Sequence, residues 1–391
     1  MVTVRLLEAL RRAGVDARMV VTHKASDKPY ISLAGSAFSR KMSFLAEHAR
    51  IFASNGFSYR NVFKVSVATA GLPLASHPWI EDADIVCLNW VNQGMLSLDG
   101  IAAIKAPIVW TMHDMWNLTG ICHHAGDCNA FLMRCGLCPQ LGSAARPDDI
   151  SRQCFFKKEA LYRQKNIRFV AVSHWLHDLC VQSPAMAGRD VSVIPNAFPV
   201  ADFYPAPRVP RFKLGLPAGT LITMGAARLD DPIKGLDLAI DALNRLAATG
   251  SDAKAVFFGA LKDPHALDML RMPHVNLGPV PQDKIGEILA HSSVVLSSSH
   301  YETLPGTLVE GMAAGAWPVA FDHGGQRDIV DHLSTGYLAR YADTADLADG
   351  IRKGLASPAD RDKQHRIVAG RFDSDVIARR YIDLFNDIIS R

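Results

Sequence analysis

Hydrophobic and polar residues alternate along the chain in short blocks that predict strands and helices in turn. Residues 4–13 have the spacing of an amphipathic helix that ends at Gly14, and an apolar run typical of a strand follows. That run covers residues 17–22, and the same pattern predicts strands at 85–89, 107–112, 167–172 and 191–194 and a helix at 154–165. Strands separated by amphipathic helices favour parallel sheets with crossover helices.

A proline-rich segment interrupts this alternation and is typical of a linker, with Pro195, Pro199, Pro205, Pro207 and Pro210. The alternation then resumes, with strands predicted at 221–225, 255–258, 275–280, 294–297 and 318–321 and helices at 234–248, 282–290, 306–314 and 372–389. We therefore predict an α/β protein with two doubly wound parallel-sheet domains facing across a cleft. The predicted domains are residues 1–197, with a cysteine-rich insertion at 120–141, and residues 205–370. Residues 371–391 are expected to cross back to the first domain.

The order of elements at the amino terminus is unusual for such a domain. A doubly wound domain begins with a strand and a glycine-rich turn, whereas the first predicted element here is already a helix. We therefore expect the first strand of the amino-terminal domain to be missing.

Chain length, net charge and the distribution of apolar residues exclude several classes of protein. A chain of 391 residues is long enough for two cores, and a net charge of +3 does not indicate a nucleic-acid partner. No uncharged apolar run approaches the ~20 residues of a membrane-spanning helix. Arg5 and Glu8 interrupt the stretch where a signal peptide needs continuous apolar residues. These features predict a cytoplasmic protein, with peripheral contact to the inner membrane left open.

Residues 297–325 carry the most informative chemistry. An apolar strand leads through a loop into a helix that begins near Gly306, and the free N–H groups and dipole of a helix start favour a phosphate. Glu302 and Glu310 flank this position. A carboxylate repels a bound anion, so these two residues suit neutral hydroxyls of a ribose and a sugar. The alternative is a solvated loop Glu302 and a Glu310 that caps the helix.

Two cations follow an earlier predicted strand. Arg228 lies just past its end and Lys234 lies six residues further on, so both side chains can converge on a diphosphate. Together they would neutralise a leaving diphosphate without a divalent cation. The alternative is that Arg228 pairs with Asp230 or Asp231 and that Lys234 only begins a helix.

These residues together resemble the family 4 retaining glycosyltransferases of the GT-B fold, which has two Rossmann-like domains. The resemblance rests on Glu302 and Glu310, on Arg228 and Lys234 upstream, and on 324–325, a Gly-Gly pair, downstream. The amino-terminal half is similar to a narrower group, the colanic-acid and exopolysaccharide type, through residues 88–92, 109–120 and 135–141.

The resemblance implies a retaining, metal-independent transferase that moves a sugar from a UDP- or GDP-sugar to a glycan or lipid-linked acceptor in cell-surface polysaccharide biosynthesis. It implies that no cofactor is required for catalysis. Glu310 would bind the ribose, Glu302 the donor sugar, and His113 would face the transferred sugar. The implied catalytic residues are His113, Arg228, Lys234 and Glu302, and the implied donor-binding residues are Gly225, Leu304, Pro305, Gly306, Thr307, Leu308, Glu310 and, at the hinge, Asn196. Without the resemblance, a histidine that caps a strand end is the favoured interpretation of His113.

The cysteine segment has the spacing of a metal site: Cys122, Cys128, Cys135 and Cys138 lie within it, and the last two form the Cys-x2-Cys half-site usual for zinc. A structural zinc, disulfides and free thiols all fit this spacing, and either neighbouring histidine, 123 or 124, is an alternative ligand. Four protein ligands leave no open position, so a zinc here is not catalytic. The other cysteines, Cys87, Cys154 and Cys180, are expected to be buried thiols.

Basic and aromatic residues interleave at 40–64, which indicates either a surface for a lipid-linked acceptor or a solvated helix face. Two other functions stay open: a catalytically silent nucleotide-sugar-binding protein, and a nucleotide-sugar epimerase or phosphorylase of the same architecture. A nicotinamide dehydrogenase is disfavoured because no Gly-x-Gly-x-x-Gly turn follows a strand.

Overall fold

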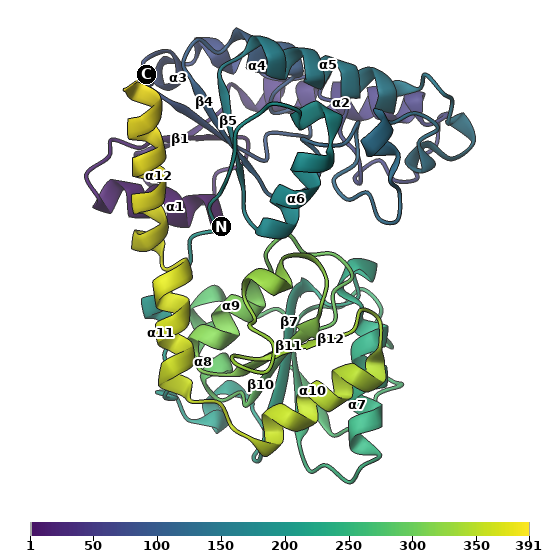
Figure 1. Cartoon of the computed structure of the whole chain (residues 1–391), viewed down its shortest axis with the longest axis vertical. Coiled ribbons are helices and arrows are strands. Elements are labelled where there is room, and N and C mark those ends of the chain that lie inside the picture. The colour runs from purple at the N-terminus through teal and green to yellow at the C-terminus, as the bar shows by residue number, and fades with distance from the viewer. Residues whose placement is uncertain (1, 391) are drawn as a thin grey trace. The chain divides into compact units, whose positions relative to one another are not determined.

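The computed structural model describes residues 2–390, which form two compact units (Figure 1). The carboxyl-terminal unit contains Pro195–Ala378 and the residues up to Leu6. The amino-terminal unit contains Leu7–Ile194 and the residues from Arg379 onward. Within residues 2–390, no helix has both the length and the apolar content needed to cross a bilayer.

The carboxyl-terminal unit is built on a six-stranded parallel sheet. Its strands are β7 (Leu221–Arg228), β8 (Lys254–Ala260), β9 (His274–Asn276), β10 (Val294–Ser297), β11 (Trp317–Phe321) and β12 (Tyr337–Ala339). They lie in the order β12-β11-β10-β7-β8-β9, which reverses direction between β7 and β10. A ligand in a sheet of this kind binds where the order reverses, beyond the carboxyl ends of the strands.

Helices cover both faces of this sheet (Figure 1). Helices α7 (Leu236–Ala247) and α10 (Thr344–Ala356) pack together on one face, and α8 (Gln282–Ala290), α9 (Gly306–Ala313) and α11 (Arg361–Phe372) pack on the other. The core on the α7 and α10 face contains Leu243, Phe257 and Phe321, all at most 1% exposed. Burial on both faces explains why these strands read as continuous apolar runs.

The amino-terminal unit contains a four-stranded parallel sheet in the order β3-β4-β5-β6 and a separate parallel pair, β1-β2. The strands are β1 (Met19–Val21), β2 (Ile31–Leu33), β3 (Val86–Asn89), β4 (Ile108–Met112), β5 (Ile167–Ala171) and β6 (Val191–Val193). The helices include α2 (Ala37–Ser54), α3 (Pro78–Glu81), α4 (Leu98–Ala103), α5 (Ile150–Gln164) and α6 (His174–Gln182). In the core of this unit Trp110 stacks on Phe169, and Tyr162 packs edge-to-face against both rings.

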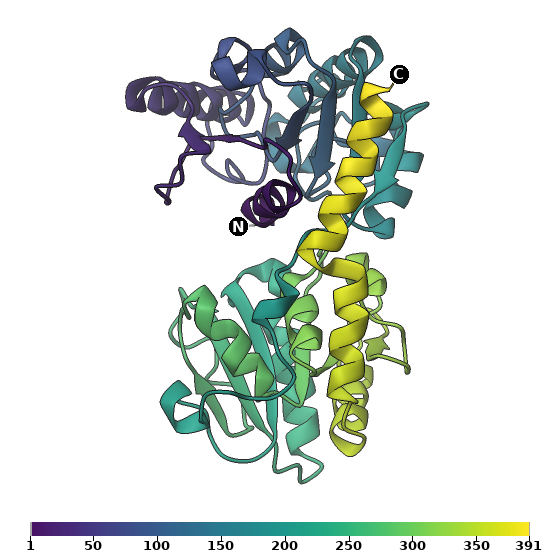
Figure 2. The same cartoon turned by 90° about the vertical axis from the view of Figure 1, so that its left-hand side faces the viewer.

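The first and last helices contribute to both units. Helix α1 (Val2–Arg12) begins in the carboxyl-terminal unit and ends in the other, and α12 (Ser374–Ile389) does the same. The part of α12 from Arg379 onward lies alongside the four-stranded sheet (Figure 2), where the Tyr381 hydroxyl hydrogen-bonds Thr111 Oγ1 of β4 at 2.8 Å.

The α/β class with two parallel-sheet units is confirmed, and α8 and β10 have the predicted bounds. Most other elements differ from the prediction by a few residues at their ends, and two differ in ways that have a structural reason. Strand β9 ends at Asn276 rather than 280, because Gly278 adopts a left-handed φ of 65° that turns the chain. Strand β1 pairs with β2 and not with the larger sheet, so the first described element of the amino-terminal unit is the end of α1.

Candidate functional site

The start of α9 lies at the carboxyl end of the central strands of its sheet. Strand β10 neighbours β7, and the Thr307 hydroxyl of α9 donates to the Gly225 carbonyl of β7 at 3.1 Å. Gly306 and Thr307 are in the first helical turn, where backbone N–H groups have no acceptor inside the helix. The start of α9 therefore lies at the reversal point of the sheet, and its free N–H groups suit a phosphate-type anion.

The loop before α9 is fastened to the turn that carries Lys234. Ser298 Oγ donates to the carbonyls of Lys234 and Gly235 at 3.0 and 2.7 Å, and the His300 N–H donates to the Ile233 carbonyl at 2.8 Å. Gly235 has a φ of 60°, and a Cβ there would lie 2.2 Å from the Ser298 carbonyl oxygen. Only glycine therefore allows this approach of the two segments.

The Gly-Gly pair downstream holds the other side of the same loop. The Gly325 N–H donates to the Glu302 carbonyl at 2.8 Å. A Cβ on Gly325 would lie 1.9 Å from the Thr303 carbonyl oxygen, and one on Gly324 would lie 2.6 Å from that of Glu302. These two glycines thus fix the backbone on which the Glu302 side chain is mounted.

The structure brings Lys234 and Glu302 together. Lys234 Nζ donates to Glu302 Oε1 at 2.5 Å, and the Ser299 hydroxyl donates to the same oxygen at 3.2 Å. Their side chains are 29% and 19% exposed, so the pair faces solvent only in part. A cation and an acceptor carboxylate that share one small space can contact a diphosphate and a sugar hydroxyl side by side.

Arg228 pairs with aspartates, as the alternative interpretation predicts. Its Nη2 lies 2.8 Å from Asp231 Oδ2, and its Nε lies 3.6 Å from Asp230 Oδ1. Among the described residues, the buried Nε has no hydrogen-bond acceptor. The Nε therefore contributes only this longer ion pair with Asp230, and the shorter contact of the guanidinium is with Asp231.

Both aspartates also have backbone partners. Asp230 Oδ2 accepts the N–H groups of Asp263 and Lys262 at 2.9 and 2.8 Å, and these hydrogen bonds hold the pKa of Asp230 below its usual value. Asp231 Oδ1 accepts the Ile233 N–H at 3.2 Å and caps the turn before Lys234. Their local role is to shape the loops that carry the two cations.

Glu310 has a partner that sequence reasoning missed. Arg5 of α1 lies 2.9 Å from its Oε1, and both side chains are 11% exposed. Burial raises the pKa of Glu310, and the Arg5 charge opposes that rise. The two residues are 305 positions apart, and the only sequence signal was a charged residue within a short apolar stretch.

The other predicted residues fall into two groups. Leu304, Pro305 and Leu308 are buried around the start of α9, and Asn196 lies half-buried where the carboxyl-terminal unit begins. His113 belongs to the amino-terminal unit, beyond the end of β4.

Asn89, the last residue of β3, holds the His113 ring. Its Nε2 hydrogen-bonds Asn89 Oδ1 at 2.9 Å. Burial lowers the pKa of His113 to about 4, although the nearby Asp114 charge opposes this. The imidazole is therefore neutral near pH 7.

The amino-terminal unit contains a cavity of about 630 Å³ next to α2. Aromatic, basic and amide side chains line it, among them Arg40, Lys41, Phe44, Phe63, Trp90, Asn92 and Gln93. Trp90 and Gln93 have left-handed φ values of 42° and 58°, a strain that clusters at binding sites.

A buried polar network holds these two strained residues. Trp90 Nε1 donates to Asp114 Oδ2 at 2.9 Å, and the same oxygen lies 2.6 Å from His123 Nδ1. Ser66 Oγ hydrogen-bonds His123 Nε2 at 3.0 Å and accepts from Gln93 Nε2 at 3.2 Å. Ser66 is fully buried, so this Ser-His-Asp arrangement positions side chains and does not present a nucleophile.

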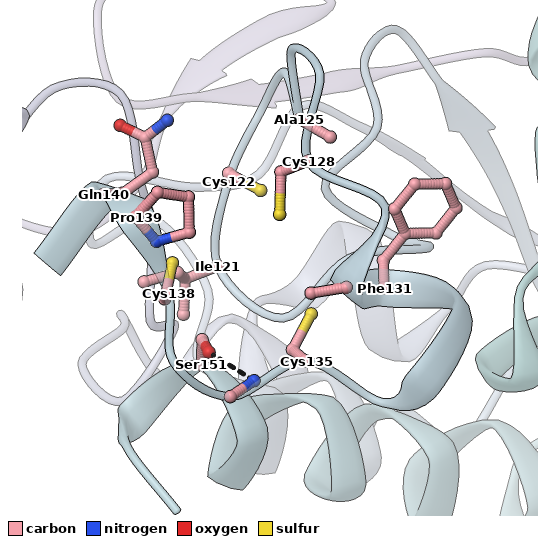
Figure 3. Close-up of a pocket in the computed structure, with 12 residues that line it drawn as sticks. Ile121, Cys122, Ala125, Cys128, Phe131, Cys135, Cys138, Pro139, Gln140 and Ser151 are labelled. Atoms are coloured by element: carbon pink, nitrogen blue, oxygen red, sulfur yellow. Dashed lines mark hydrogen bonds between the residues drawn. The ribbon is translucent and has the colours of Figure 1, made fainter. Parts of the chain in front are cut away.

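The four cysteines of the predicted insertion line one small cavity (Figure 3). Among residues 2–390, no three His, Cys, Asp or Glu side chains already stand at metal-ligand distances. Of the other cysteines, Cys154 and Cys180 are buried as predicted. The expectation for Cys87 was wrong: it is exposed, because it lies on the opposite face of β3 from buried Val86 and Leu88.

Residues 209–370 match the family described as Glycosyl transferases group 1. This range contains β7, the Lys234 turn, Glu302 and α9. The segment that matches this family therefore lies within the carboxyl-terminal unit. The assignment to the narrower exopolysaccharide group stays a prediction.

Sequence relatives match the chain over part of their length. The phosphatidylinositol N-acetylglucosaminyltransferase GPI3 subunit of Saccharomyces cerevisiae (strain YJM789) is 23% identical over 235 residues, which cover 57% of this chain and 51% of the yeast protein. The chain spans about half the length of the curated relatives it matches.

Solved structures share the fold over nearly the whole chain. A glycosyltransferase from Rickettsia africae aligns with a TM-score of 0.69 at 16% identity, over 100% of this chain and 94% of its own. Anabaena HepE in complex with UDP and glucose aligns with a TM-score of 0.61 at 18% identity, over 98% and 95%. These similarities establish the GT-B glycosyltransferase fold, with two Rossmann-like units.

Proposed function

We propose that this protein is a retaining glycosyltransferase that uses a UDP- or GDP-sugar as donor. The observation that carries the proposal is the fastened loop that brings Lys234, Glu302 and the first turn of α9 to one edge of the sheet. The match to glycosyl transferases group 1 covers this loop, and HepE, which shares the fold, binds UDP and glucose. Both support a nucleotide-sugar donor.

Each donor group has a residue of matching chemistry. The diphosphate would lie at the N–H groups of Gly306 and Thr307, between Lys234 and the Arg228 guanidinium, which would share its charge with Asp230 and Asp231. Glu302, oriented by Lys234, would accept hydrogen bonds from the sugar hydroxyls.

Glu310 is assigned to the ribose hydroxyls. Because Arg5 already pairs with this carboxylate, the ribose must share it or displace the guanidinium. His113, neutral at pH 7, is assigned to orienting the transferred sugar.

These positions favour front-face substitution. Double displacement requires a nucleophilic carboxylate on the face opposite the leaving group, and inversion requires a base there. Glu302 and Glu310 both belong to the unit that would hold the diphosphate, and both flank its anion site. The bond from the acceptor oxygen to the anomeric carbon would form as the bond to phosphate breaks, and the departing phosphate oxygen would take the hydroxyl proton. Arg228 and Lys234 would stabilise the charge that develops.

The acceptor is assigned to the cavity of the amino-terminal unit. Phe44, Phe63 and Trp90 offer apolar faces for a sugar or lipid chain, and Arg40 and Lys41 suit a phosphate of a lipid-linked glycan. Phe38 and Phe63 are each 74% exposed and Tyr59 82%, which favours peripheral contact with a membrane carrying that acceptor.

The proposal is tested by measuring sugar release from a panel of UDP- and GDP-sugars, with and without lipid-linked acceptors. We expect acceptor-dependent release from one donor, lost in Glu302→Ala and kept in Asp349→Ala, an exposed carboxylate of α10 that serves as the matched control. Conversion of the donor to its epimer would favour an epimerase, and tight nucleotide binding without turnover across the panel would favour a silent binding protein.

A further inference from the structure

The segment between β4 and α5 has little regular structure to support it. From the end of β4 at Met112 to Ile150, only two short 3-10 turns occur, Ala130–Met133 and Pro139–Ala144. Met133 and Leu137 are 75% and 63% exposed, so apolar packing holds it only in part. Irregular segments of this length within a compact unit need another source of order, such as a covalent or metal cross-link.

The four cysteines of this segment line one small cavity. Cys122, Cys128, Cys135 and Cys138 line a cavity of about 10 Å³, close to the volume that a single water-sized particle occupies. Figure 3 shows the sulfur atoms directed from separate parts of the loop toward the space they enclose. Four thiols around a one-atom space are the ligand set of a structural tetrahedral metal site.

The backbone is shaped to present these thiols. Four successive residues have left-handed φ values, Arg134 (65°), Cys135 (57°), Gly136 (104°) and Leu137 (48°). Such strain in non-glycine residues persists only where the surroundings impose it and clusters where ligands are clamped. A Cβ on Gly136 would lie 2.4 Å from the Pro147 carbonyl oxygen, so the turn depends on glycine.

Backbone hydrogen bonds fix the loop that carries Cys135 and Cys138: one N–H group donates to a cysteine sulfur, and two others donate to side chains outside the loop. The Gly120 N–H donates to Cys135 Sγ at 3.2 Å, so this sulfur has a fixed position in the loop. The Cys138 N–H donates to Asp149 Oδ2 at 2.9 Å, and the Gly136 N–H donates to Ser151 Oγ at 3.1 Å, the dashed line in Figure 3.

The histidines beside Cys122 do not complete the ligand set. Both ring nitrogens of His123 are already hydrogen-bonded, to Asp114 and to Ser66. His124 does not line the cavity. The four cysteines are therefore the ligands that the geometry favours.

We propose that Cys122, Cys128, Cys135 and Cys138 bind one zinc ion that cross-links the segment between β4 and α5. The thiols lie around a common space but not yet at ligand distances, so rotation of the cysteine side chains closes the site around the ion. With four protein ligands the ion has no open position, so it orders the segment and takes no part in sugar transfer. The site is independent of the proposed donor chemistry.

The test is elemental analysis of the full chain, purified under reducing conditions without added metal. We expect about one zinc per chain, at least tenfold less in Cys135→Ser and in Cys138→Ser, and an unchanged content in Cys87→Ser, an exposed cysteine outside the segment.

A second measurement uses the wild-type chain, so its outcome does not depend on whether a cysteine variant folds. The wild-type chain loaded with Co²⁺ should show the intense absorption of cobalt bound by thiolates in a tetrahedral site. Native thiol titration before and after metal removal should then reveal four additional reactive thiols. A protein that is purified without metal and whose four thiols already react before any chelation overturns the proposal, and so does one in which they react only after reduction of disulfides.

Discussion

Replacing Lys234 with alanine removes one of the two cations assigned to the donor diphosphate. A charge-assisted hydrogen bond contributes about 1.5–3 kcal/mol, equivalent to about 10–150-fold in rate. The Lys234 side chain is 29% exposed, so solvent screens part of this contribution. We therefore expect kcat/KM for the donor to fall by roughly 10–30-fold, at the lower end of that range.

The structure adds a second consequence of this substitution. Without the ammonium group, Glu302 Oε1 loses its 2.5 Å ion pair and keeps the hydrogen bond from the Ser299 hydroxyl at 3.2 Å. If Lys234 also orients Glu302, the double variant Lys234→Ala with Glu302→Gln loses less than the product of the two single effects. If Lys234 acts on the diphosphate alone, the two effects multiply.

The assay is initial-rate kinetics at varied donor concentration, with acceptor saturating. Lys353→Ala on α10 is the matched control, because Lys353 is an exposed lysine of the same unit, remote from α9 in the sequence. An interaction made only in the transition state lowers kcat together with kcat/KM. A Lys234→Ala enzyme within twofold of wild type, with unchanged thermal unfolding, would refute the assignment of Lys234 to the diphosphate.

Three further predictions concern metal, pH and stability. Sugar transfer should survive EDTA added to the assay, because side-chain cations and the start of α9 supply the positive charge; loss restored by Mg²⁺ but not by Zn²⁺ would contradict this. Burial lowers the pKa of His113 to about 4, against an ordinary value of 6.5. Between pH 4 and pH 6.5, His113 is therefore protonated in the unfolded chain and neutral in the folded chain. Stability should therefore fall as the pH drops through this window, by up to about 1.4 kcal/mol per pH unit, and His113→Gln should lessen the fall in urea unfolding curves; an unaltered pH dependence would exclude this cause. Arg5→Met should lower the free energy of unfolding by about 3–5 kcal/mol, because it removes the cation that pairs with the buried Glu310 carboxylate. Adding Glu310→Gln should recover part of this loss, whereas additive losses in the double variant would argue against coupling of the two residues.

Local patterns made most of the fold predictable. Strand β10 and helix α8 have the predicted bounds because apolar spacing and breakers such as Pro281 act within a few residues. The motif around Glu302 was readable for the same reason, since strand, loop and helix follow one another in the sequence.

Contacts between distant segments were not predictable from these patterns. Nothing local links Arg5 to Glu310, and Lys234 and Glu302 are 68 positions apart, so the sequence indicated their common ligand but not their ion pair. The aspartate partners of Arg228 were foreseen only as an alternative, because a neighbouring carboxylate and a bound diphosphate are both suitable partners for a guanidinium.

The acceptor-side cavity was the least predictable feature. The basic and aromatic residues of α2 were visible in the sequence, but the strained backbone at Trp90 and Gln93 was not. That strain depends on Asp114, His123 and Ser66, which approach only through the tertiary fold.

The central claim is transfer with retention at the donor loop, and proton NMR of the first product tests it most directly. The reaction is followed from mixing, with the donor that supports turnover, so that the anomeric coupling of the new glycoside is read before any later change. We predict that the product of the wild-type enzyme has the anomeric configuration of the donor and that formation of this product is lost in Glu302→Ala. An inverted product, or a sugar found covalently attached to Glu302 by mass spectrometry, would contradict the account.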